Sequence, residues 1–146
     1  MSPSDEEELV KDGWNRVTDT CIPENVMQHV WGLLLESWNE KSGKTPYFHL
    51  CCVLDKLIED GVIVPRLNES WVWAAHNAGI PVFVPGWSDS TTGNMFTASV
   101  KKGEIKTGYN AVVSDAEQFA ILANWYESQI TESGESPAFL QIGGGI

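Results

Sequence analysis

The sequence has few cysteines and none of the spacings typical of a metal site. Its three cysteines are Cys21, Cys51 and Cys52, and an adjacent pair cannot easily meet ordinary disulfide geometry. Neither a Cys-x-x-Cys pair nor a His-x-x-x-His pair occurs, although zinc sites use such pairs. We therefore expect no metal, and we predict reduced thiols that face the core from a helix.

Basic residues and long apolar runs are also scarce. Nine Lys and Arg stand against twenty Asp and Glu, which gives a formal net charge of −11. Such a charge repels a phosphate backbone and favours cationic or neutral partners, so nucleic-acid binding is not expected. Because no apolar run reaches about 18 residues and no signal-peptide pattern is present, we expect a cytoplasmic protein without membrane association.

The familiar phosphate-binding loops are missing as well. The sequence contains no Gly-x-Gly-x-x-Gly, and the stretch from Gly86 to Gly93 is not followed by the lysine of a Walker-type loop. These motifs therefore give no evidence for a nucleotide site.

Apolar periodicity and capping residues predict a mostly helical chain. One predicted helix begins within residues 2–7, and a second begins at residues 23–24 and is ended by Gly43 and Pro46. A third covers about 48–60, and a fourth follows Asn68 or Ser70 and is ended by Gly79. Two more cover about 91–102 and 114–127. The intervening stretch 14–20 is interpreted as a polar linker. His29 and His76 fall on helices, without a Ser, Cys or Asp partner nearby in sequence, and are expected at the surface or an interface.

Two short apolar runs, residues 82–84 and 138–142, have the composition of parallel strands covered by helices on both faces. Strands separated by helices predict an α/β fold with a Rossmann-like parallel sheet and helical crossovers. Two strands are fewer than the four to six usual for a sheet. We therefore expect an incomplete fold, in which residues 1–146 are the central part of a single domain.

Small polar residues follow the first of these runs, where α/β sheets usually hold their ligands. Asp89 could accept hydrogen bonds from ribose hydroxyls or pair with an ammonium group, or it and its hydroxyl neighbours could only cap the next helix. Trp87 in the same loop could wall an apolar pocket or face a cationic substrate. The glycines at 143–145 allow backbone to approach a ligand closely, or they form a turn.

Three stretches in order resemble the deoxyhypusine synthase family, and in particular its bacterial deoxyhypusine synthase-like branch. They are NRVTDTCIPE at 15–24, IPVFVPGWSDSTTGN at 80–94 and LQIGGG at 140–145. The resemblance extends over essentially the whole chain, and the ordered series is more specific than any one motif.

The resemblance implies an NAD-dependent aminobutyl transferase that acts on spermidine or a related polyamine. In this chemistry NAD oxidises the polyamine, a lysine carries the four-carbon unit as an imine, and a protein lysine or a free diamine accepts it. The family fold is a Rossmann-like NAD-binding domain, usually a homotetramer with active sites between subunits.

Carried over by position, the resemblance assigns Asp89 and Gly144 to cofactor binding. Asn94 stands where deoxyhypusine synthases carry an aspartate that holds the polyamine amine, and Trp87 joins it as a candidate substrate contact. The family's histidine and catalytic lysine have no counterpart here, so no catalytic residue is assigned. The chain alone is expected to be inactive, as a central fragment of the enzyme.

Two alternatives stay open at this point. One is a regulatory or assembly subunit of the same family that keeps the fold without the chemistry. The other, outside the family, is a nucleotide-binding interaction module that uses the same loops.

Overall fold

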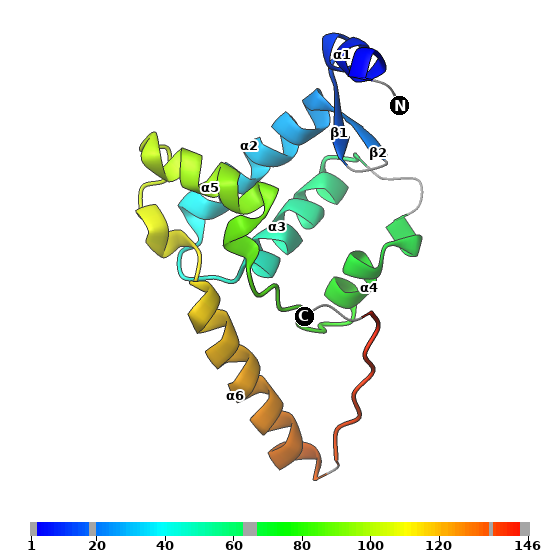
Figure 1. The fold of residues 1–146 in the computed structure, drawn as a ribbon. Helices are drawn as coiled ribbons and strands as arrows, with labels where there is room; N and C mark the ends of the chain where they lie inside the picture. Colours follow the sequence, from blue (N-terminus) through cyan, green and yellow to red (C-terminus); the bar gives the residue numbers. More distant parts are fainter. Residues whose placement is uncertain (1–2, 18–19, 63–66, 135, 144–146) are drawn as a thin grey trace.

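The protein is a mixed α/β structure that consists mostly of helices (Figure 1). The computed structural model describes residues 3–17, 20–62, 67–134 and 136–143. Its elements in order are α1 (Pro3–Lys11), β1 (Trp14–Val17), β2 (Thr20–Pro23), α2 (Glu24–Glu40), α3 (Pro46–Glu59), the short 3-10 helix η1 (Leu67–Glu69), α4 (Trp71–Asn77), the 3-10 helix η2 (Trp87–Asp89), α5 (Thr91–Lys101), the 3-10 helix η3 (Gly108–Ala111) and α6 (Asp115–Ser133).

The helices lie where the sequence predicts them, and their capping residues show why. Ser70 accepts a hydrogen bond from the backbone of Trp73 at the start of α4. Ser114 and Glu117 form a capping box at the start of α6, in which each side chain bonds the other residue's backbone N–H. Pro46 was expected to end a helix, but it lies in the first turn of α3, where its missing N–H costs nothing.

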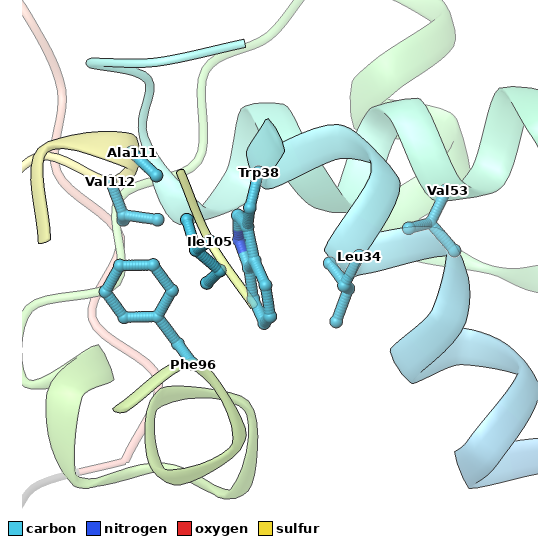
Figure 2. Close-up of a cluster of buried hydrophobic side chains, with 7 residues drawn as sticks. All are labelled: Leu34, Trp38, Val53, Phe96, Ile105, Ala111 and Val112. Carbon is cyan, nitrogen blue, oxygen red and sulfur yellow. The ribbon is translucent and has the colours of Figure 1, made fainter. Parts of the chain in front are cut away.

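The core lies where α2 meets α3, α5 and the segment that ends in η3 (Figure 2). Trp38 of α2 is 1% exposed, and its ring meets the ring of Phe96 edge-on at 5.1 Å between centroids. The buried cluster consists of Leu34, Trp38, Val53, Phe96, Ile105, Ala111 and Val112. It fixes α5 against α2, and α5 in turn positions the loop that precedes it.

The stretch expected to be a polar linker is a β-hairpin. Strands β1 and β2 pair antiparallel, with Trp14 opposite Pro23 and Arg16 opposite Cys21. The prediction of a linker was wrong because it rested on the polar residues of this stretch. Thr20, Cys21 and Ile22 suit a strand that has an adjacent partner. This hairpin is the only sheet in the described part of the chain.

The expected parallel strands do not form among the described residues. Residues 81–84 and 136–142 have no ladder partner, and the one parallel pairing found is an isolated bridge between Lys44 and Val112. A strand needs a neighbour to bond its backbone N–H and C=O groups, so apolar composition alone does not make one. The described residues therefore show no Rossmann-like parallel sheet, and Phe139, Leu140 and Ile142 are more than four-fifths exposed.

The cysteines are free thiols, as their spacing predicts. Cys51 in α3 is buried and Cys52 beside it is half-buried, whereas Cys21 lies in β2 and not in a helix. No helix within the described ranges is long and apolar enough to cross a bilayer.

Candidate functional site

The loop that follows residues 82–84 is held by hydrogen bonds to the first turn of α5. Trp87 Nε1 donates to Thr92 Oγ1 over 2.8 Å, and Ser90 Oγ accepts from the backbone N–H of Gly93 over 3.1 Å. Gly86 begins the loop with φ of 82°, a left-handed conformation that favours glycine. The small and hydroxyl residues of this stretch therefore build a tight connection from η2 into α5.

Asp89 lies exposed at the end of η2 and does not cap α5, because Ser90 does. The backbone N–H of Asp89 bonds the carbonyl of Gly86, but its carboxylate has no hydrogen bond or ion pair with the residues that the structure describes. The carboxylate oxygens are thus available to accept hydrogen bonds from a ligand. The alternative that these residues only cap the next helix therefore applies to Ser90, and not to Asp89.

Gly93 brings the backbone of α5 unusually close to η2. A Cβ placed on Gly93 would lie 2.4 Å from the carbonyl oxygen of Trp87 and 2.8 Å from that of Ser88. No side chain other than hydrogen fits this gap, so the glycine is what allows η2 to pack on the first turn of α5.

A crevice of about 540 Å³ opens beside this loop. Ser88 Oγ donates to Asp115 Oδ2 over 2.7 Å, which ties η2 to the start of α6 across the crevice. Its walls come from the Trp87 loop, from α5 and from the segment that leads into α6; the lining residues are Gly43, Trp87, Ser88, Gly93, Phe96, Thr97, Tyr109, Asn110, Val112, Val113, Ser114 and Glu117.

The crevice combines aromatic walls with the N-terminal ends of two helices. The ring of Phe96 lies 5.5 Å from that of Trp87 and 6.2 Å from that of Tyr109. The first turns of α5 and α6 border the crevice through Gly93 and Ser114, and such ends favour negative groups. Hydrogen bonds from the backbone and side chain of Ser114 lower the pKa of Glu117, so this carboxylate stays ionised.

The candidate residues from the sequence lie around this crevice in different ways. Trp87 lines it, whereas Asp89 and Asn94 are exposed and do not line it. Gly144 lies outside the described residues. Ser88, Asp115 and the wall at 109–114 were not predicted as site residues. The signal for them was the run of apolar residues 111–113 followed by Ser114 and Asp115, which repeats the pattern at 82–90.

The histidines do not belong to this crevice. His29 is exposed, as expected, and His76 Nε2 lies 2.8 Å from Asp55 Oδ1, a partner that sequence spacing did not reveal. His49 is buried, bonded to Ser37 Oγ at 2.8 Å and to the carbonyl of Ala111 at 3.3 Å. Burial lowers the pKa of His49, so it acts as a neutral tie between α2, α3 and η3.

Comparison with known proteins identifies the family. The family model of deoxyhypusine synthase matches residues 2–146, so the chain belongs to the deoxyhypusine synthase family. The proteins of this family are known as aminobutyl transferases that depend on NAD. No curated protein and no solved structure was found to match.

Proposed function

We propose that this chain forms part of the NAD and polyamine site of an aminobutyl transferase of the bacterial deoxyhypusine synthase-like branch. The observation that carries the proposal is the unpartnered Asp89 carboxylate, presented beside the crevice by a loop in a chain of this family.

The residues present fit NAD. The carboxylate of Asp89 suits ribose hydroxyls, because an ionised acceptor makes stronger hydrogen bonds than a neutral one. The first turn of α5 suits the pyrophosphate, because it carries no acidic residue, and the aromatic wall of Trp87 and Phe96 suits a flat ring. Gly144 is proposed as a further contact. When bound, NAD supplies an acceptor for the hydride that leaves the amine.

A polyamine suits the acidic chain, with Trp87 and Asn94 as proposed contacts. We propose spermidine or a related polyamine as the donor of the aminobutyl group, and a protein lysine or a free diamine as its acceptor. No lysine is among the residues that line the crevice, which supports the expectation that these residues alone do not transfer the aminobutyl group. By resemblance we propose a cytoplasmic homotetramer, and the free thiols suit a reducing compartment.

The contacts of α6 support the parallel sheet as a proposal. Trp125 meets Phe83 at 6.2 Å between ring centroids, and its neighbour Tyr126 meets Phe139 at 5.9 Å. One helix thus contacts both segments expected to be strands, as a crossover helix does in a parallel sheet. We place residues 82–84 and 138–142 in such a sheet, within a single domain that has residues 1–146 as its central part.

Replacing Asp89 with alanine is expected to weaken NAD binding by about 1.5–3 kcal/mol, or about ten- to a hundredfold, because a hydrogen bond to a charged acceptor is lost. The fold should persist, since this side chain is exposed and makes no bond within the described chain. Calorimetric titration of NAD measures the change, with Asp12→Ala as a control that removes an exposed carboxylate from the turn after α1. Equal affinities in the two variants would remove Asp89 from the cofactor site.

Replacing Asn94 with aspartate is expected to tighten polyamine binding, because a charge-assisted hydrogen bond is about twice as strong as a neutral one. Asn94 is exposed on α5, so the change requires no repacking. Affinities for spermidine and putrescine are compared in the two forms at low salt. Unchanged affinities for both amines would show that Asn94 does not contact them.

A further inference from the structure

The hydroxyl of Ser88 links the loop that carries Asp89 to the start of α6. Ser88 Oγ donates to Asp115 Oδ2 over 2.7 Å, although the two residues are 27 positions apart. A carboxylate acceptor makes such a hydrogen bond shorter and stronger than a neutral acceptor does. The rest of α6 extends away from the other helices, so this contact lies at the end of α6 that is nearest to them (Figure 1). The bond thus joins two elements on opposite sides of the crevice.

Asp115 is itself held in place. Its second oxygen, Oδ1, accepts a hydrogen bond from Gln118 Nε2 over 3.0 Å, and Gln118 is 2% exposed. The chain just before α6 is anchored as well, because the backbone N–H of Val113 bonds the carbonyl of Lys44 over 3.0 Å. Asp115 therefore offers Ser88 an acceptor whose position is fixed by the rest of the fold.

Restraints of a different kind hold η2 against α5. Ser90 caps α5 next to Asp89, and Gly93 lets the two elements pack closely. Before η2, no backbone hydrogen bond reaches residues 81–83 in the part of the chain that the structure describes. The contacts with α5 leave the distance from η2 to α6 open, and the hydrogen bond from Ser88 sets it. Asp89, directly after Ser88, is therefore held relative to both sides of the crevice.

Asp115 separates a positioning role from direct contact with a ligand. Ser88 lines the crevice, whereas Asp115 is not among the lining residues. Asp115 can therefore act on a ligand in the crevice through the group that it holds or through its charge. Its negative charge repels an anionic cofactor such as NAD, so loss of the charge alone would tighten binding. Loss of a positioning contact would weaken binding instead.

We propose that Ser88 and Asp115 are positioning residues for Asp89, and that their hydrogen bond holds the Asp89 carboxylate where NAD meets it. Both residues act through Asp89 and not by contact with the cofactor. The inference rests on the proposed NAD site, and it names two further residues on which the affinity of that site depends.

Calorimetric titration of NAD into variants of the chain tests this role. Ser88→Ala and Asp115→Ala are each expected to weaken NAD binding about two- to tenfold, the change in population that loss of one hydrogen bond produces. Ser88→Thr keeps a hydroxyl at an exposed position and should restore the affinity. The control Ser128→Ala removes a hydroxyl that donates within α6, to the carbonyl of Trp125, and should leave the affinity unchanged.

A double-mutant cycle distinguishes positioning from contact. In the Asp89→Ala background, Ser88→Ala should have no further effect on NAD affinity, because the carboxylate through which it acts is gone. If Asp89→Ala weakens binding, the positioning role alone is overturned by effects that add, by Ser88→Ala binding NAD as the unsubstituted chain does, or by tighter binding in Asp115→Ala. An Asp89→Ala variant with unchanged affinity overturns the proposed NAD site itself, and this inference with it.

Discussion

Gly93→Ala is expected to destabilise the protein by about 2–3 kcal/mol, the upper part of the range for overpacking. The added Cβ meets backbone oxygens of Trp87 and Ser88, and the Trp87 oxygen is itself held by a hydrogen bond from the N–H of Ser90 at 2.9 Å. Backbone tied in this way cannot move aside as a flexible side chain can. The clash therefore outweighs the gain of about 1 kcal/mol that alanine brings to a helix.

Urea unfolding followed by circular dichroism measures this change. Gly32→Ala in α2 is the matched control, because a Cβ there meets nothing within 4 Å and should stabilise the helix. If Gly93→Ala proves as stable as Gly32→Ala, η2 does not pack on α5 as described. The position of Asp89 relative to the crevice would then be wrong as well.

Trp38→Ala is expected to cost about 3–5 kcal/mol, because it removes the largest buried side chain and leaves a cavity between α2 and α5. Trp38→Phe should cost much less. The indole Nε1 is buried without a hydrogen-bond partner in the described structure, so phenylalanine also removes an unsatisfied donor.

The same unfolding experiment compares the two substitutions. A loss with phenylalanine as large as with alanine would mean that the indole N–H has a partner on which stability depends. A small loss with alanine would contradict the placement of the core around Trp38.

The helices were predictable because their signals are local. Thr45 and Ser70 accept hydrogen bonds from the backbone three residues later, and the spacing of apolar residues on α2 depends on nothing outside the helix. The hairpin of β1 and β2 also pairs residues close in sequence. It was not predicted, because polar residues such as Asn15 and Arg16 are more typical of a linker than of a strand. The strands expected at 82–84 and 138–142 do not form among the described residues. A strand depends on a neighbour to pair with, which apolar composition does not reveal.

The candidate site also has a part that could be predicted from local sequence and a part that could not. The position of Trp87 and Asp89 in a loop was predictable because a short apolar run leads directly into that loop, and their role in binding stays a prediction. The tie from Ser88 to Asp115 joins residues 27 positions apart, and the aromatic wall needs Phe96 and Tyr109 from different elements. Such pairs become visible only when α5 and α6 are placed in space.

The most direct test of the NAD site uses the indole signal of Trp87. The chain has seven tryptophans, and Trp87 lines the crevice while its Nε1 bonds Thr92. Nitrogen–proton spectra recorded during an NAD titration, with the Trp87 signal assigned by Trp87→Phe, follow all the indoles at once. We predict that the Trp87 signal shifts to saturation, that Asp89→Ala raises the NAD concentration required, and that the signal of exposed Trp71 on α4 does not move. A Trp87 signal that stays fixed at saturating NAD, or shifts unaffected by Asp89→Ala, would contradict the proposed site.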